Sequence, residues 1–219
     1  MSEEKTLWDK LKEPFKADDI EWRLSRCGTN TKGIWGIALA YVTNRAIQNR
    51  LDEVVGPDNW KNEFQLIPSG GALCGISIRV KHSDNSEEWI TKWDGSDNSD
   101  IEATKGGLSG AMKRAAVQFG IGRYLYNLTE SFVNISENGK MSGKTKEGKW
   151  FKWDPPSLPA WALPVDPKLE ELKNGVLDYI NSGIIKDKAA DQAKMYIDTN
   201  NKAGLQRTID WCKKQENAA

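Results

Sequence analysis

The sequence predicts an α+β fold with a β-β-β-α core, in which an antiparallel sheet of three to five strands packs on one long helix. Apolar and polar residues alternate in three successive runs between residues 60 and 93, which is typical of an antiparallel meander with one buried face. Residues 99–123 instead follow the period of a helix. Residues 168–211 hold two or three shorter helical patterns, so a small helical segment is expected at the C-terminus.

The composition is that of a folded protein with one sizeable core and one small extra module. The 219 residues are 38% hydrophobic and 28% charged, and the formal net charge is zero. We expect no membrane span, because no apolar run approaches the roughly 20 residues that a span requires. The mixed-charge N-terminus is not expected to be a secretory signal. Three widely spaced cysteines indicate neither a disulfide framework nor a zinc site, so we expect a cytoplasmic protein.

Predicted helices and one strand precede the meander. Residues 5–26 are interpreted as one or two short helices broken at Pro14, and residues 27–33 as a polar loop. Large and small residues alternate over residues 35–41, which predicts a strand. Thr43 or Asn44 can then cap a helix that ends before the Gly56-Pro57 pair.

After the long helix, the sequence becomes less regular. Residues 124–128 and 132–135 are predicted as short edge strands, and residues 137–149 as a flexible loop with four lysines and two glutamates. Both a solvated linker and a nucleic-acid contact remain open for that loop. The predicted organisation is a helical arm (1–19), a core domain (20–136), a flexible Lys-rich and Pro/Trp-rich linker (137–167) and a helical C-terminal segment (168–219).

The long helix has two faces of different character. One carries the apolar residues Ile101, Leu108, Met112, Ala115, Ala116 and Phe119, and the other carries Gly106, Gly107 and Gly110 beside Lys113 and Arg114. Three mid-helix glycines cost about 3 kcal/mol relative to alanine. A bare backbone edged by cations therefore suits something that presses close, such as a phosphodiester strand or a neighbouring subunit. Residues 103–123 hold four cations (Lys105, Lys113, Arg114, Arg123) and no acid.

Residues for catalysis are scarce. His82 is the one histidine, which leaves no partner for a histidine-based triad or metal site. The GGLSGAMKR segment lacks the G-K-[ST] ending of a phosphate-binding loop, so nucleotide hydrolysis is not expected. We expect no enzyme and no cofactor. The rival interpretation is a metal-dependent nuclease that uses the acidic cluster Asp94, Asp97, Asp100 and Glu102.

That acidic cluster also has a structural interpretation. Ser99 and Glu102 form a capping-box pattern, and acids are favoured in the first turn of a helix in any case. Lys105 is unusual for a charged residue, because at 100° per residue it lies only about 40° from the middle of the apolar stripe. Either the helix overhangs its sheet at that end, or Lys105 is held for a charged ligand.

Three segments carry a family resemblance. They are Ala40-Tyr41 leading into a helix, the stretch from Gly56 to Trp60 at the end of that helix, and Lys105-Gly106-Gly107 through Lys113-Arg114-Ala115 to Phe119-Gly120. Over roughly residues 20–130 the chain resembles the Rad52-type single-strand annealing proteins, especially the phage-encoded group called Sak.

The resemblance implies a homo-oligomeric ring that binds single-stranded DNA in a cationic groove and anneals complementary strands in recombination and repair without ATP. It implies a phage-encoded protein acting in a bacterial host. By motif, it assigns DNA binding to Tyr41, Lys105, Lys113 and Arg114, and to Arg26 upstream of the first strand. An arginine of eukaryotic members is Val117 here, and Arg123 is a candidate to compensate for it.

Two further hypotheses accompany this interpretation. The glycine face of the long helix can instead be a subunit contact in a purely structural oligomer. The C-terminal segment, from its layout of linker followed by helices, is a candidate docking module for a single-strand-binding protein or a partner exonuclease.

Overall fold

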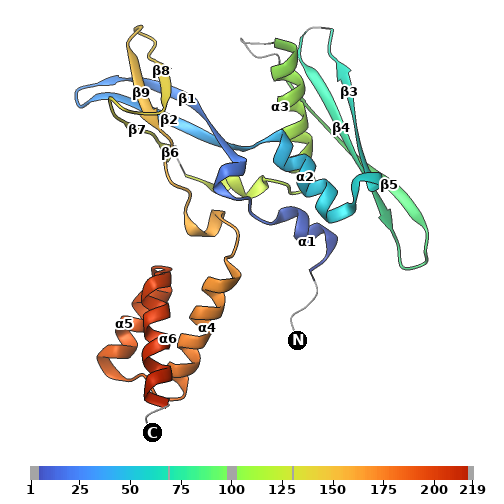
Figure 1. The fold of residues 1–219 in the computed structure, drawn as a ribbon. Helices are drawn as coiled ribbons and strands as arrows, with labels where there is room; N and C mark the ends of the chain where they lie inside the picture. The colour runs from blue at the N-terminus through green and yellow to red at the C-terminus, as the bar shows by residue number, and fades with distance from the viewer. Residues whose placement is uncertain (1–4, 69, 98–102, 130, 217–219) are drawn as a thin grey trace. The chain divides into compact units, whose positions relative to one another are not determined.

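In the computed structural model the chain forms two compact units, Met1–Pro164 and Val165–Ala219 (Figure 1). The structure describes residues 5–68, 70–97, 103–129 and 131–216. Each unit has a hydrophobic core of its own.

The N-terminal unit is the α+β part of the chain. Its helices and strands are α1 (Leu7–Lys12), β1 (Ile20–Asn30), β2 (Gly33–Val42), α2 (Asn44–Val55), β3 (Trp60–Leu66), β4 (Ala72–Lys81), β5 (Glu87–Ser96), α3 (Ala103–Gln118), β6 (Ser131–Phe132), β7 (Asn134–Ile135), β8 (Met141–Lys144) and β9 (Trp150–Asp154). Short 3-10 helices occupy Ala17–Asp19, Pro57–Asn59, Arg123–Asn127 and Ala160–Ala162.

The predicted β-β-β-α core is confirmed. Strands β3, β4 and β5 form an antiparallel sheet, and α3 packs along β4 and β5 (Figure 1). The centre of this core is apolar, with Ile76 of β4 and Ala111 and Ala115 of α3 entirely buried. Helix α2 packs against α3. The hydroxyl of Thr43 caps the N-terminus of α2 as predicted.

The first hairpin differs from the sequence prediction. Residues 20–26 are predicted as helix and residues 27–33 as loop, but β1 runs through both and pairs with β2 along its whole length. A register shift between Leu24 and Arg26 interrupts the alternation of β1, so the period-2 signal is broken in the middle. Pairing with β2 overrides the weak local preference.

The long helix is shorter than predicted at its C-terminal end. It ends at Gln118, and Gly120 and Gly122 follow with φ angles of +92° and +71°, a region that favours glycine. Residues 124–128, predicted as an edge strand, lie instead in the 3-10 helix Arg123–Asn127 and just beyond it. The predicted capping box of Ser99 and Glu102 falls outside the described residues.

The segment predicted as a flexible linker contains a β-hairpin. Strand β9 pairs with β8 on one side and with the short β7 on the other. Trp153 is 1% exposed and packs with Phe151 against Ala38 and Val133, which anchors the hairpin on the β1–β2 sheet. Burial of these aromatic side chains explains why a lysine-rich stretch is ordered here.

The C-terminal unit consists of three helices, α4 (Pro167–Asn181), α5 (Asp187–Asp198) and α6 (Lys202–Glu216), in agreement with the predicted two or three. Asp166 caps α4, and its carboxylate also bonds Lys202 at the start of α6. Val176, Leu205 and Cys212 are fully buried between the helices. Across the described part of the chain, none of the helices has the length and apolar character needed to cross a membrane.

Candidate functional site

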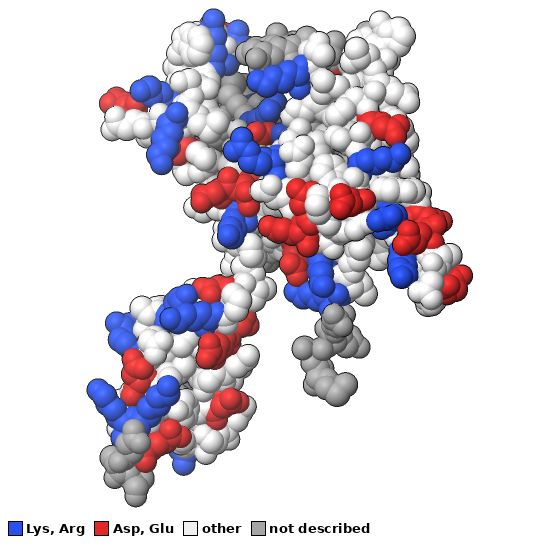
Figure 2. All heavy atoms as spheres, turned by 45° about the vertical axis from the view of Figure 1, so that its right-hand side comes forward, with Lys and Arg blue, Asp and Glu red and all other residues white. Residues whose placement is uncertain are grey.

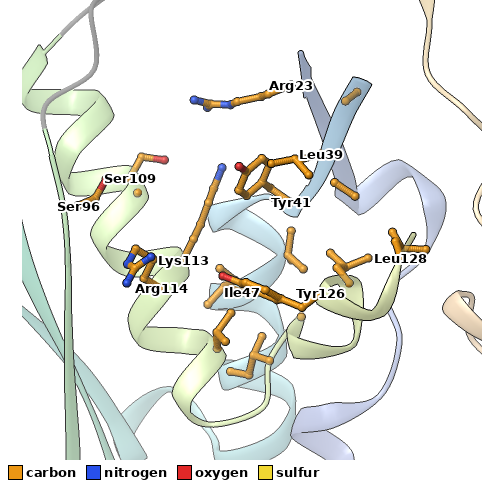
Figure 3. A pocket seen from close by; sticks show the side chains of 18 of the residues that line it. Arg23, Leu39, Tyr41, Ile47, Ser96, Ser109, Lys113, Arg114, Tyr126 and Leu128 are labelled. Carbon is orange, nitrogen blue, oxygen red and sulfur yellow. The ribbon is translucent and has the colours of Figure 1, made fainter. Parts of the chain in front are cut away.

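A groove of about 650 Å³ lies between β2 and α3 (Figure 3), and we call it the α3–β2 groove. Figure 2 shows Lys and Arg side chains gathered around a hollow in the upper half of the N-terminal unit. The residues that matter most for the chemistry of the groove are Arg23, Tyr41, Ser109, Lys113, Arg114 and Tyr126.

The two sides of the groove come from different parts of the chain. On β2, Leu39 and Tyr41 point to one face of the sheet, and their cross-strand partners on β1 are Arg23 and Glu21. On the opposite side, α3 presents Lys113. The Lys113 Nζ lies 5.7 Å from the centroid of the Tyr41 ring, so β2 and α3 bring these two predicted residues together (Figure 3).

A carboxylate sits among the cations of this side of the groove. Glu21 forms an ion pair with Lys113, and its Oε1 lies 3.3 Å from Arg23 Nη2. The Lys113 side chain is only 13% exposed. An anionic ligand must therefore compete with Glu21 for Lys113, and binding involves an exchange of partners rather than capture by an unpaired cation.

Arg114 also has a carboxylate partner. Its Nε lies 2.9 Å from Asp94 Oδ1 on β5, although the arginine side chain remains 55% exposed. Burial alone would raise the pKa of Asp94, but hydrogen bonds from the Gly95 backbone, Arg114 and Gln118 outweigh it and hold that pKa below its usual value.

The nuclease alternative depends on the acidic cluster around Asp94. Asp94 is occupied by Arg114, Asp97 lines the groove, and Asp100 and Glu102 fall outside the described residues. Among the residues that are described, no group of three His, Cys, Asp or Glu side chains is placed to hold a metal ion. The described part of the acidic cluster therefore lends no support to a metal site.

Arg123 bonds the C-terminal end of α3. Its guanidinium donates hydrogen bonds to the carbonyl oxygens of Val117 (2.8 Å) and Gln118 (2.7 Å), and Lys92 donates to the Gln118 carbonyl as well. Both cations therefore bind the C-terminal end of α3, where free carbonyls and the helix dipole favour positive charge. A DNA-binding role for Arg123 remains a prediction.

The remaining predicted residues lie beside the groove rather than among its lining residues. Lys105 is exposed near the start of α3, and Arg26 is exposed on β1, paired across the strands with Ile37. Ile37 and Tyr41 share one face of β2 by alternation, so Arg26 belongs to the groove side of the sheet. DNA contacts by Lys105 and Arg26 remain predictions.

The three glycines of α3 do not share one environment. Gly106 and Gly110 line the groove, as expected for an open flank, but Gly107 is buried. A Cβ at Gly110 would lie 2.8 Å from Ser96 Cβ, so this glycine also allows β5 to approach the helix closely. The interpretation of all three glycines as one outward face is therefore wrong for Gly107.

Sequence reasoning missed two residues of the groove, Arg23 and Tyr126. The sequence predicts a helix over this part of β1, and a helix does not place Arg23 opposite Leu39 of β2. Tyr126 is 69% exposed and follows the predicted end of the long helix. The signal that the sequence offers is an aromatic residue soon after Gly120 and Gly122.

Comparison with known proteins agrees with this architecture. Residues 3–144 match the model of the Rad52/22 family double-strand break repair protein. The single-stranded DNA-binding protein DdrA of Deinococcus radiodurans is 32% identical over 163 residues, which cover 71% of this chain and 66% of that protein. The protein of the same name from Deinococcus deserti is 35% identical over 156 residues, covering 71% of this chain and 69% of the relative.

The family match ends at the last residue of β8, so β9 and the C-terminal unit lie beyond it. Membership of the Sak group remains a prediction. The matched residues include the complete β-β-β-α core and both sides of the α3–β2 groove. On this basis the chain belongs to the Rad52/22 family of double-strand break repair proteins.

Proposed function

We propose that this protein binds single-stranded DNA in the α3–β2 groove and anneals complementary strands during recombination and repair, without nucleotide hydrolysis. The observation that carries the proposal is the meeting of Tyr41 and Lys113 across a cavity of about 650 Å³. Membership of the Rad52/22 family and similarity to two single-stranded DNA-binding proteins support it.

The carboxylates of the groove set the mechanism of binding. A phosphodiester that enters the groove replaces Glu21 at Lys113 and Asp94 at Arg114, and these two acids return to solvent. Each phosphate contact also releases counterions, so the affinity falls with salt at a slope of about −0.7 per contact for single strands. Strong salt dependence is therefore expected.

Annealing follows from which part of the strand is held. Contacts to phosphate carry no sequence information, so a strand gripped by its backbone is bound whatever its sequence. Its base edges are then available to a complementary strand. A homo-oligomeric ring, which the family resemblance implies, sets many grooves in series and keeps a long strand extended.

A double substitution in the groove tests the proposal. In the Lys113→Gln, Arg114→Gln variant, the affinity for a fluorescent oligo-dT strand is expected to fall at least tenfold, measured by anisotropy. Glutamine keeps a hydrogen-bonding side chain beside Glu21 and Asp94. Exposed Lys213 and Lys214 of the C-terminal unit provide a control pair for the same Lys→Gln change.

The same preparations separate annealing from cleavage. Complementary labelled strands are expected to pair faster with the wild-type protein in the absence of ATP, and to stay intact with Mg²⁺ or Mn²⁺. Unchanged oligo-dT binding by the double variant at moderate salt, with unchanged thermal unfolding, overturns the groove assignment. Loss of intact strands in the presence of metal overturns the non-enzymatic assignment.

We also propose the three-helix C-terminal unit as the docking module for a single-strand-binding protein or an exonuclease. Its separate core supports a unit that works apart from the groove. Deletion of residues 165–219 is expected to leave oligo-dT affinity unchanged and to abolish partner recruitment in a pull-down with the purified partner. Unchanged recruitment contradicts this assignment.

A further inference from the structure

A second cationic surface lies on the β8–β9 hairpin, and we call residues 140–152 the lysine hairpin. This stretch carries five lysines against one glutamate, Glu147, in a chain whose net charge is zero. All five lysines are exposed. They are Lys140, Lys144, Lys146, Lys149 and Lys152.

The register of the hairpin sorts its residues onto two faces. Gly143 pairs with Phe151 and Met141 with Trp153, and these aromatic side chains are buried against the β1–β2 sheet. The alternate residues form the outer face, where Lys144 lies opposite Trp150 and Lys152 follows two residues later. The fold therefore displays an aromatic ring between two lysines on the outer face of the hairpin.

Trp150 is unusually open to solvent. It is 70% exposed, whereas Trp153 on the other face of the same strand is 1% exposed. The Lys144 Nζ lies 5.4 Å from the centroid of the Trp150 ring. Within the described chain, none of the five lysines has a carboxylate within ion-pair distance, in contrast to Lys113 and Arg114 of the groove.

We propose that the lysine hairpin is a second contact for single-stranded nucleic acid, with an unpaired base stacked on Trp150 and phosphates bound by the flanking lysines. A flat, exposed aromatic side chain beside cations is the pattern that binds single strands without sequence preference. Duplex DNA offers no unstacked base to Trp150. An acidic protein surface would account for the lysines but not for the exposed tryptophan. The identity of the ligand rests on the proposed function, but the surface consists of other residues.

Strand β1 links the two surfaces. Arg23 lines the groove, and Cys27 of the same strand donates a hydrogen bond from its thiol to the Lys144 carbonyl oxygen (3.3 Å). Four residues of strand span about 13 Å at roughly 3.3 Å per residue. That distance equals about four stacked nucleotides at 3.4 Å each. The hairpin packs on the face of β2 that carries Ala38, whereas Leu39 and Tyr41 of the groove point to the opposite face. One oligonucleotide that contacts both surfaces must therefore pass around an edge of this sheet.

The test substitutes the tryptophan and the lysines separately in the full chain. Trp150→Ala is expected to weaken oligo-dT binding about fivefold or more, from the loss of one stacked base. Trp150→Phe is expected to retain most of the affinity. Trp161→Ala is the matched control, because Trp161 is also exposed (52%) but lies outside the hairpin.

The probe strand separates stacking from charge. An oligonucleotide of the same length with abasic sugars is expected to bind wild type and Trp150→Ala equally. The Lys144→Gln, Lys152→Gln variant is expected to lower the salt slope for oligo-dT by about 1.4, from two lost phosphate contacts. The Lys213→Gln, Lys214→Gln control leaves the slope unchanged.

The possible outcomes distinguish this inference from the proposed function. If the wild-type protein does not bind oligo-dT at all, the proposed function fails and the inference fails with it. If the groove variant weakens binding and Trp150→Ala does not, the inference alone is overturned. Equal losses for duplex and single strands overturn base stacking, and a change in particle mass for Trp150→Ala assigns the hairpin to a subunit contact instead.

Discussion

The α3–β2 groove and the lysine hairpin hold cations of the same chemical type in opposite electrostatic settings. In the groove, Lys113 is largely buried and paired with Glu21, and Arg114 is paired with Asp94. In the hairpin, lysines such as Lys144 are exposed and lack carboxylate partners within the described chain. The comparison shows that the number of positive charges on a surface does not by itself determine how strongly that surface binds an anionic strand. The groove holds its cations in fixed positions and releases them by exchange, whereas the hairpin supplies solvated charge beside a stacking ring.

The largest effect is expected where the groove depends on close packing. A Cβ at Gly110 would lie 2.8 Å from Ser96 Cβ, so Gly110→Ala forces β5 away from α3. We expect a steric cost of about 2–3 kcal/mol, which exceeds the roughly 1 kcal/mol that alanine gains in a helix. Urea unfolding measures the difference. The Gly110→Ala, Ser96→Gly double variant is expected to regain stability, and a double variant no more stable than the single one contradicts this packing.

Removing the groove carboxylate is expected to strengthen binding. Glu21→Gln takes away the acid that competes for Lys113 and Arg23, so oligo-dT affinity should rise about threefold to tenfold, in line with roughly 1 kcal/mol for an ion pair. Glu171→Gln on the exposed surface of the C-terminal unit is the matched control and should change affinity less than twofold. Equal or weaker binding by Glu21→Gln argues against partner exchange.

The Asp94–Arg114 pair predicts an acid-dependent loss of stability. Because the folded-state pKa of Asp94 is lowered, its contribution is complete above its unfolded pKa of about 3.9 and is lost as the pH falls through the folded value. Thermal unfolding of wild type and Asp94→Asn should therefore differ most at pH 6 and converge in strong acid. A difference that stays constant with pH contradicts the pairing.

The smallest effect concerns the thiols. Burial raises the pKa of the Cys74 thiol to about 11, and Cys74 and Cys212 have no exposed surface. At pH 8 a thiol reagent should label Cys27 in the folded protein and the other two only after unfolding. Because Cys27 bonds Lys144, its labelling should alter hairpin-dependent binding and spare the groove. Rapid labelling of Cys74 in the native state contradicts the core described above.

Much of the central architecture could be predicted from the sequence, because single periodic signals dominate there. The alternation of β3 to β5 and the helical spacing of α3 both reflect burial on one face. The family resemblance, not the periodicity, assigns Tyr41, Lys113 and Arg114 to one site, and all three line the groove. The C-terminal helices followed from the same kind of spacing.

The parts that escaped prediction depend on distant contacts. Strand β1 is interrupted by its register shift, and the β8–β9 hairpin is held by burial of Trp153 against β2. The partners of the groove cations were equally hidden, since Glu21 lies 92 residues from Lys113 in the sequence. No local sequence pattern predicts an ion pair between residues so far apart in the chain.

Photochemical cross-linking tests the central claim most directly. An oligonucleotide that carries 5-iodouracil joins covalently to aromatic side chains within van der Waals contact, and mass spectrometry locates the adduct. Binding in the α3–β2 groove predicts an adduct on Tyr41 that excess unlabelled oligo-dT suppresses. Adducts confined to the C-terminal unit Val165–Ala219, with none on β2, contradict the groove as the seat of the strand.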